Sequence, residues 1–408
     1  MKKHILSSLL FFAAVLTPCL QACTFLWGTT EDETVQEIFE QGSIDPQLVP
    51  NQVGYVPILP FWNVSEPIDV YAGYDQMVYI VTPAGLEVRD LKGTLHRLIA
   101  IPDATDVVQD RRLHTYVCGR VTRIIDGTPY RLAAVFHIIG AAGSGEPVFA
   151  DTLIHPFCDV SRNNTAFRGA DDEAVSFTGL ATLHDNTLYV SRSGPTNNLA
   201  SAARPDNTIL LFDAEGKNIG YTNGLSPTVS SLKSCLNVGA LAGFAAPPQQ
   251  VFGISTSPDF LLVQQAEAAQ YKALWIVQAV DPDAGITWKQ NDALLQFDLS
   301  RADRFLYTPN RFTLPADIYV APDAAGYIFL VDAARDSLYQ FTRKGYEGVN
   351  PPPNSTQTKQ ILASFGGTGS GPYQFCQPSG VCYLNKTVYV ADRGNNRICR
   401  YKLSTDLQ

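Results

Sequence analysis

The sequence lacks the short motifs by which common enzyme classes are recognised. It contains no G-x-S-x-G, no H-E-x-x-H, no Walker loop and no EF-hand calcium loop. The histidines are scattered at spacings that place no pair of metal ligands on one strand or helix. We therefore interpret each of them as a surface or core side chain: His96, His114, His137, His155 and His184.

Basic residues are also scarce relative to acidic ones. The chain has 30 Lys and Arg against 39 Asp and Glu, a net charge of −9. Removal of residues 1–22 as a signal peptide would take Lys2 and Lys3 with it, leaving 28 basic residues and a net charge of −11. This charge disfavours nucleic acid as a partner, because binding to phosphates depends on an excess of Lys and Arg.

No apolar run is long enough for a comfortable membrane span. The run "ILSSLLFFAAVL" follows Lys2 and Lys3 and has the form of a signal peptide. It ends in "LQAC", Leu20 to Cys23, which resembles the bacterial lipobox. That resemblance implies a lipid anchor of palmitate-type acyl chains on Cys23; the alternative is an ordinary export signal cut near Ala22.

The residues after Cys23 bear on where the protein is anchored. Thr24 rather than Asp follows the cysteine, which by resemblance to Gram-negative lipoproteins implies the outer membrane. Acidic residues after the cysteine are similar to surface-export signals of Bacteroidetes lipoproteins, but "EDE" begins eight positions later, so the periplasmic and cell-surface faces both stay open. We expect a signal peptide at 1–22, a lipidated Cys and acidic tether at 23–46, and a folded domain at 47–408.

Paired C-x-x-C spacing of the kind found in zinc sites is absent. The cysteines beyond Cys23 are Cys118, Cys158, Cys235, Cys376, Cys382 and Cys399. Export would permit disulfides, and the sequence leaves their pairing open. Cys382 and Cys399 lie in expected strands that are not adjacent, so we interpret them as buried small hydrophobic residues.

What the sequence does contain is a series of short β-rich runs. The clearest is "TVYVADRGNNRICRYKL", residues 387–403, where two apolar runs flank a polar turn. The pattern predicts a β-hairpin, and a hairpin of two strands needs further partners to be stable. No long helical periodicity follows residue 45, and 30 Gly and 26 Pro suit many turns.

The same pattern of strand, polar turn, aromatic strand and Gly turn recurs along the chain, which predicts a repeat architecture. We count about six units, which begin near residues 66, 104, 177, 251, 314 and 360.

The last unit, "GGTGSGPYQFCQPSGVCYLNKTVYVADRGNNRICRY", resembles the NHL repeat, a blade of a β-propeller. Matching residues are Phe375, Pro378, Gly380, Val381, Val388 to Asp392 and Gly394 to Ile398. The resemblance implies an all-β fold, a six-bladed β-propeller. Because the last unit stops after three strands, we expect its fourth strand to come from "QVGYVPILPFW", residues 52–62.

Three acidic residues hold the same place in three units, at the start of the expected innermost strand. They are Asp69, Asp106 and Asp317, and Gly380 holds that place in the last unit. This position rims the channel of a propeller, so the carboxylates could converge on a Ca²⁺ ion on the channel axis. Alternatively, each Asp caps backbone N–H groups of its own turn.

Other polar residues are assigned to turns, loops or modification. We interpret four residues as the turn signature of the repeat: Asp392, Asn395, Asn396 and Arg397. The stretch "NPPPNSTQTK" (350–359) is interpreted as a loop between strands of one blade.

Two tripeptides, "DTL" and "DSL", resemble O-glycan sites of exported Bacteroidetes proteins, with Thr152 and Ser337 as acceptors; the alternative is a solvated turn.

Two classes of function follow. The first is an envelope-anchored lipoprotein whose propeller binds or scaffolds a protein or glycan partner at the outer membrane, without a cofactor. The second is a metal-dependent hydrolase or lyase, similar to propeller lactonases, with a cation on the axis. Lactonase-like sites combine Glu or Asp with Asn from several blades. The inner-strand starts offer Asp alone, which favours the binding module.

Overall fold

Short strands joined by tight turns make up almost all of the fold. The computed structural model describes residues 43–48, 50, 53–160, 167–195, 208–222, 237–245, 255–283, 285–323, 325–353 and 355–407. Asn385 and Lys386 both have positive φ, 49° and 63°, between two strands of the last unit. That is the backbone of a two-residue hairpin turn whose twist matches its flanking strands.

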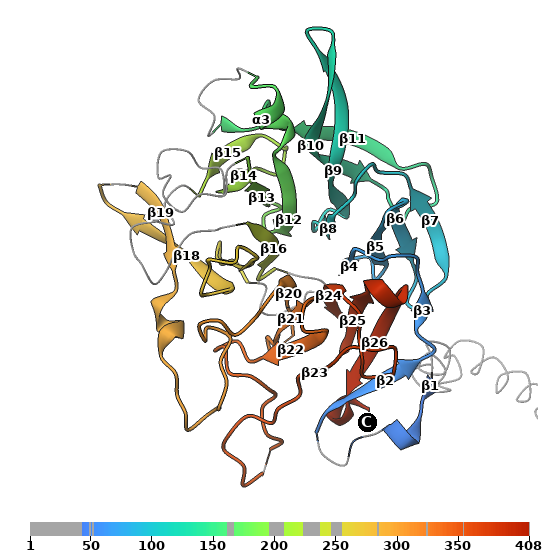
Figure 1. Ribbon diagram of the computed structural model, residues 1–408, viewed down its shortest axis with the longest axis vertical. Helices are drawn as coiled ribbons and strands as arrows, with labels where there is room; N and C mark the ends of the chain where they lie inside the picture. Colours follow the sequence, from blue (N-terminus) through green and yellow to red (C-terminus); the bar gives the residue numbers. More distant parts are fainter. Residues whose placement is uncertain are drawn as a thin grey trace, which may run out of the picture. The chain divides into compact units, whose positions relative to one another are not determined.

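The strands of residues 44–408 form six sheets, the blades of a six-bladed β-propeller (Figure 1). Blade 1 contains β4 (Asp69–Ala72), β5 (Val78–Thr82), β6 (Gly85–Arg89) and β7 (Leu95–Ile99). Blade 2 contains β8 (Asp106–Gln109), β9 (His114–Ile125), β10 (Thr128–Ile139) and β11 (Val148–Ile154). Blade 3 contains β12 (Ser176–Thr182), β13 (Leu188–Ser193), β14 (Thr208–Phe212) and β15 (Asn218–Tyr221).

The other three blades follow in chain order. Blade 4 contains β16 (Val238–Gly243), β17 (Phe260–Gln264), β18 (Ala273–Asp281) and β19 (Gly285–Gln290). Blade 5 contains β20 (Pro315–Val320), β21 (Ile328–Asp332), β22 (Ser337–Phe341) and β23 (Phe365–Gly366). Blade 6 contains β24 (Pro378–Leu384), β25 (Thr387–Asp392) and β26 (Arg397–Leu403), together with β2 (Tyr55–Leu59) and β3 (Trp62–Asn63).

Helices contribute little. The described residues include one four-residue helix, α3 (Ala170–Glu173), and short 3-10 helices at Pro46–Leu48, Asp292–Leu295, Arg393–Asn395 and Ser404–Asp406. A short strand, β1 (Ser43–Ile44), precedes the first of these. Among the described residues, no helix has both the length and the apolar character that a membrane crossing requires.

The innermost strands of the six blades surround a common axis. In order around the ring, β4, β8, β12, β16, β20 and β24 each contact the next, and β24 contacts β4 again. Each blade is antiparallel throughout and runs outward from its inner strand. The ring is therefore closed between the first and last blades.

The predicted closing strand is confirmed. In β2, Tyr55 is paired with Leu403 and Pro57 with Tyr401, and in β3, Trp62 is paired with Ile398. The N-terminal segment thus supplies the outer strand of the last blade, the role that β23 has in blade 5.

The repeat count is confirmed, but one unit was placed too late in the sequence. We expected the fourth unit near residues 251–265, whereas the inner strand of blade 4 is β16, with sequence VGALAG. Its Gly and Ala residues give little sign of a strand, since β-branched and aromatic side chains are what mark one. The loop at 350–359 lies between β22 and β23 of one blade, as predicted.

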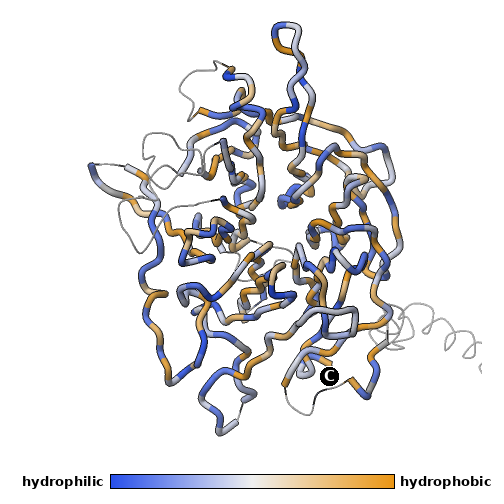
Figure 2. The backbone as a smooth tube through the Cα atoms, in the orientation of Figure 1, coloured by the Kyte–Doolittle hydropathy of each residue, from blue (hydrophilic) through white to orange (hydrophobic). Residues whose placement is uncertain are grey.

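The core lies between neighbouring blades. Its fully buried members include Tyr79, Phe212, Phe329 and Tyr401. Cys382 and Cys399 have no exposed surface, which confirms their interpretation as core residues. The cysteines of the described residues are free: Cys118, Cys158, Cys376, Cys382 and Cys399, while Cys23 and Cys235 lie outside the described residues. Hydrophobic and hydrophilic residues occur all around the ring (Figure 2).

Candidate functional site

The three predicted aspartates do lie at the channel. Asp69 and Asp106 begin β4 and β8, and Asp317 follows a bulge near the start of β20. Gly380 follows the corresponding bulge in β24. All three carboxyl groups are buried, and they line one small axial cavity together with residues of the inner strands.

Their carboxylates hold neighbouring blades together through backbone amides. Asp69 Oδ2 accepts a hydrogen bond of 3.0 Å from the Val107 amide of the next blade. Asp317 Oδ2 accepts one of 2.7 Å from the Val381 amide, again in the next blade, and Oδ1 accepts from its own neighbour Ile318.

Asp106 is bonded in the same way. Its carboxylate accepts from the Leu180 amide of blade 3. Our alternative expectation of a cap within each turn was therefore partly right, because backbone amides are the partners, but the main partner belongs to the following blade.

Where a blade has glycine at the bulge, the inner strands approach each other directly. A Cβ on Gly380 would lie 2.8 Å from the Asp69 Cα, and one on Gly179 would lie 2.9 Å from the Ala240 Cα. At these contacts the inner strands meet either through an Asp carboxylate or through a glycine with no room for a side chain, and Ala240 holds the corresponding place in blade 4.

The axial cavity is small. Its volume is about 30 Å³, enough for a water molecule but not for an organic substrate. Beyond the aspartates, the rings of Tyr71 and Tyr319 meet edge to face with their centroids 6.2 Å apart. The described residues include no group of three or more His, Cys, Asp and Glu side chains placed to hold a metal ion. A Ca²⁺ ion on the axis stays a prediction.

Burial changes the pKa values of the three aspartates. It raises the pKa of Asp69 to about 6, against the lowering effect of the Val107 and Val70 amides. It also raises the pKa of Asp106 well above its usual value, with help from the charges of Asp69 and Asp317. The pKa of Asp317 is shifted in the same direction by burial and by Asp69. Burial therefore favours the protonated forms of these three carboxyl groups.

We expect Asp69→Asn to gain stability relative to the wild type as the pH rises. The folded wild type binds a proton at Asp69 up to a pKa of about 6, whereas the unfolded chain releases it near 3.8, so ionisation destabilises the folded state through that interval. The substituted amide would keep an oxygen for the Val107 amide and would not titrate. Melting temperatures from about pH 5 to about pH 7.5 test this expectation.

Asp298→Asn is the control for that series. A hydrogen bond from the Ser300 side chain lowers the pKa of Asp298, so its ionisation lies below the tested range. Its melting-temperature difference from the wild type should stay constant. If the melting-temperature difference between Asp69→Asn and the wild type were also constant with pH, that result would contradict the raised pKa of Asp69.

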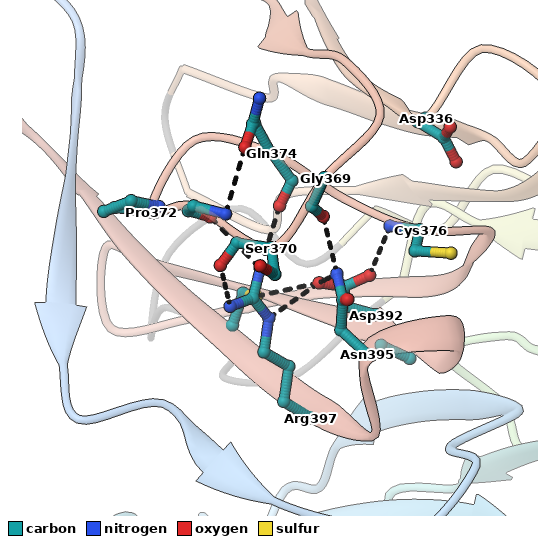
Figure 3. Close-up of polar contacts among 12 residues, drawn as sticks. Asp336, Gly369, Ser370, Pro372, Gln374, Cys376, Asp392, Asn395 and Arg397 are labelled. Atoms are coloured by element: carbon teal, nitrogen blue, oxygen red, sulfur yellow. Dashed lines mark hydrogen bonds and ion pairs between the residues drawn. The ribbon is translucent and has the colours of Figure 1, made fainter.

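The turn signature of the last blade has a structural role, as predicted (Figure 3). The buried Asp392 accepts hydrogen bonds from the Cys376 amide (2.7 Å), Asn395 Nδ2 (2.8 Å) and Arg397 Nε (2.7 Å). Arg397 also donates to the carbonyls of the Gly-rich loop, at Ser370, Gly371 and Gln374.

Asn396 completes this turn. Its backbone is left-handed, with φ of 54°. Its carbonyl accepts from the Val64 amide and its side chain from the Glu66 amide, so the turn also fastens the start of blade 1 to the last blade.

Two histidine groupings were missed by the sequence analysis. His137 Nε2 lies 2.9 Å from His114 Nδ1 across β9 and β10, and the His137 ring stacks on Tyr116. Burial lowers the pKa of both histidines, which favours their neutral forms. They lie 23 residues apart, and only the strand register brings them together.

The second grouping is buried. His155 Nε2 lies 3.1 Å from Asp172 Oδ1, and His155 Nδ1 lies 3.6 Å from Asp159 Oδ2. Asp159 also forms an ion pair with Arg192 of β13. These contacts fasten the segment after β11 and helix α3 to blade 3.

The two O-glycan candidates lie on strands. Thr152 is on β11 and lines an open hollow of about 590 Å³ with Asp151, Cys158 and Lys217. Ser337 begins β22, and its hydroxyl donates 2.7 Å to the Arg335 carbonyl. Glycosylation at these residues stays a prediction.

Comparison with known families agrees with the geometry of the last blade. Residues 375–401 match the model of the NHL repeat. The sixth blade is an NHL repeat. Curated protein sequences give no significant match to the chain.

Several solved structures resemble the chain as a whole. A protein of unknown function from Bacteroides thetaiotaomicron VPI-5482 is 14% identical, with 88% of this chain and 73% of that chain covered and a TM-score of 0.48. An auxiliary nutrient binding protein from the same organism is 10% identical, with coverage of 89% and 75% and a TM-score of 0.49. A streptogramin B lyase is 9% identical, with coverage of 86% and 98% and a TM-score of 0.41. Identities this low transfer neither a ligand nor a reaction to this chain.

The NHL blade differs from blades 3 and 4 in how its turn is built. Asp332 of blade 5 occupies the place of Asp392, and its carboxylate accepts from the Thr313 and Leu314 amides. The corresponding residues are Arg192 in blade 3 and Gln264 in blade 4. Blades 3 and 4 therefore lack the carboxylate that gathers the backbone amides in blades 5 and 6.

Proposed function

We propose that this protein is a lipoprotein anchored in the outer membrane through Cys23, with a propeller that binds a protein or glycan partner. The observation that carries the binding role is an exposed apolar pair on a hairpin of blade 4. Val280 and Ile286 face each other across β18 and β19 and are 78% and 63% exposed. Apolar side chains gathered on an exposed strand pair are typical of a surface that another protein covers.

The projection of this hairpin supports the same proposal. β18 and β19 extend outward from the ring, as does the long hairpin of β9 and β10, where Ile124 is 76% exposed (Figure 1). The axial position offers no comparable opening among the described residues, because its cavity is small and its carboxylates are engaged by backbone amides. These features favour a binding module over an enzyme with a cation on the axis.

Purification of the intact lipoprotein from membranes tests the binding role. We expect a stoichiometric partner to remain bound to the wild type and to Ile219→Asp, where the exposed apolar residue lies on β15. The double variant Val280→Asp, Ile286→Asp should lose that partner, since two carboxylates would have to be desolvated in the interface. Equal recovery of the partner with all three proteins, or recovery of no partner with any of them, would contradict the proposal.

The anchor is tested separately. Cys23→Ala should move the protein from the membrane fraction to the soluble fraction, because the acyl chains supply roughly 0.8 kcal/mol of membrane affinity for each buried CH₂. Cys19→Ala lies in the same expected signal segment and should leave the protein in the membrane. Retention of Cys23→Ala in the membrane fraction after a high-salt wash would contradict the lipoprotein proposal.

A further inference from the structure

A second pocket lies where the two ends of the propeller chain meet. It has a volume of about 320 Å³ and is lined by residues of β2, the β20–β21 turn, the β24–β25 hairpin and the C-terminal end of β26. Its polar lining consists of Tyr55, Asp323, Tyr327, Tyr383, Lys386, Thr405 and Asp406. Both blade 5 and the NHL blade contribute, and the ring-closing strand completes it.

The tyrosines present their hydroxyl ends to this pocket rather than the faces of their rings. Tyr383 is stacked on Phe329, with centroids 5.5 Å apart and planes at 19°. Tyr55 packs edge-on against Phe329 and also contacts Phe365. A sugar ring needs an open aromatic face for stacking, and the stacking of Tyr383 on Phe329 covers one such face.

One of these hydroxyl groups has no partner within the described part of the chain. Tyr55 is only 5% exposed, yet its hydroxyl forms no hydrogen bond with any described residue. By contrast, Tyr383 donates 2.6 Å to Asp323 Oδ2, and the Tyr327 hydroxyl accepts 3.2 Å from the Asn350 amide. Because Tyr55 lines the pocket, its hydroxyl is available to a ligand group there.

The residues that line the pocket include two carboxylates, Asp323 and Asp406, and one ammonium group, that of Lys386. Asp406 is paired with Lys386 at 2.8 Å. Asp323 is bonded by neutral groups alone, namely the amides of Ala325 and Gly326 and the Tyr383 hydroxyl.

The tyrosines respond to this charge. Burial raises the pKa of Tyr55 well above its usual value, and the charges of Asp406 and Asp323 raise it further. Burial and the same two carboxylates also raise the pKa of Tyr327. Because two carboxylates and one ammonium group line the pocket, its lining suits a positively charged ligand.

We propose that this pocket binds an alkylammonium group, supplied either by a free diamine or by a lysine side chain of a partner. The ammonium would donate to Asp323 and to the Tyr55 oxygen, and Leu403 and Ala325 would pack against its alkyl stem. Charge-assisted hydrogen bonds of this kind are stronger than neutral ones. The site is independent of the hairpin of blade 4, so it extends the proposed function without depending on it.

Titration calorimetry on the full mature chain tests the site. The probes are 1,5-diaminopentane for a free amine, Nα-acetyl-lysine methylamide for a lysine side chain, and 1-pentanol as the uncharged control. We expect the two amines to bind and the alcohol not to bind, and the tighter of the two amines identifies the source. Binding of the alcohol as tightly as the amines, or no binding of either amine, would overturn the proposal.

Three substitutions test which residues of the pocket bind the amine. Asp323→Asn keeps an oxygen for the turn amides and removes the charge, so it should weaken amine binding about tenfold or more. Tyr55→Phe keeps the ring and should weaken binding by about threefold to tenfold. Lys386→Met should tighten it, because Asp406 becomes available as a second carboxylate.

Two matched controls should leave amine binding unchanged. Asp185→Asn alters the corresponding turn of blade 3, where Asp185 accepts from the Thr187 amide. Tyr307→Phe removes another buried hydroxyl that has no hydrogen bond within the described chain. Equal affinities for Asp323→Asn and Asp185→Asn would refute the site, and weaker amine binding by Lys386→Met would contradict the role given to the carboxylates.

Discussion

A chain that begins at Val64 should unfold far below the temperature at which a chain beginning at Ile44 unfolds. The shorter chain lacks β2 and β3, so β26 would become an open edge with unpaired backbone groups. It would also lose four side chains that are no more than 8% exposed: Tyr55, Val56, Ile58 and Trp62.

The size of the effect follows from burial. Each of these side chains contributes roughly 1.5 to 3 kcal/mol when fully buried. Their sum is comparable with the whole net stability of a domain, about 5 to 15 kcal/mol. The shorter chain should therefore be insoluble or melt far lower, whereas the chain from Ile44 retains the whole propeller.

Thermal unfolding of the two purified chains, followed by circular dichroism, measures this difference. Val56→Ala in the longer chain gives a graded comparison, since Val56 is fully buried and is paired with Lys402. It should lower stability by about 1 to 3 kcal/mol without opening the ring. Equal melting temperatures for the two truncations would show that the N-terminal strand does not close the propeller.

Asp392→Ala should destabilise the protein by about 3 to 5 kcal/mol, the usual cost of removing one partner from a buried ion pair. The substitution leaves the Arg397 guanidinium, the Asn395 amide and the Cys376 amide without their common acceptor (Figure 3). Because the Gly-rich loop is held by Arg397, it should lose its fixed position as well.

Urea unfolding at neutral pH provides the measurement. Arg393→Ala is a neighbouring control, because Arg393 is exposed in the same turn and no hydrogen bond of its side chain is recorded among the described residues. Surface changes of this kind usually shift stability by no more than about 0.5 kcal/mol. A loss of similar size for both variants would mean that the Asp392 network contributes nothing particular to the NHL blade.

The parts of the fold that the sequence predicted are those built from local patterns. The "DRGNN" turn needs left-handed backbone at Asn396, and its residue types indicate this directly. The closing strand was predictable because the last unit lacked one strand and a β-rich run preceded the first unit. Blade 4 was harder to place, because an inner strand of Gly, Ala, Leu and Val carries no alternation of polar and apolar residues.

The site was less predictable because its contacts join distant residues. Asp69 and the Val107 amide are 38 residues apart, and nothing near either residue indicates that they meet. The repeat pattern located Asp69, Asp106 and Asp317 at the channel but could not show where their carboxylates point. The pocket around Tyr55 combines residues from both ends of the propeller, so no short motif describes it.

The closing strand also dictates when the propeller can finish folding. The amide of Gly54 is bonded to the side chain of Ser404, 350 residues later. Any chain emerging from a ribosome or an export channel must therefore hold the segment around β2 unpaired until almost its last residues have appeared. Contacts of such long range make folding slow and leave strand edges exposed to other chains in the interval. We expect the unfinished chain to depend on chaperones until these last residues have appeared, and a chain truncated a few residues before Leu403 to be recognised as unfinished and degraded.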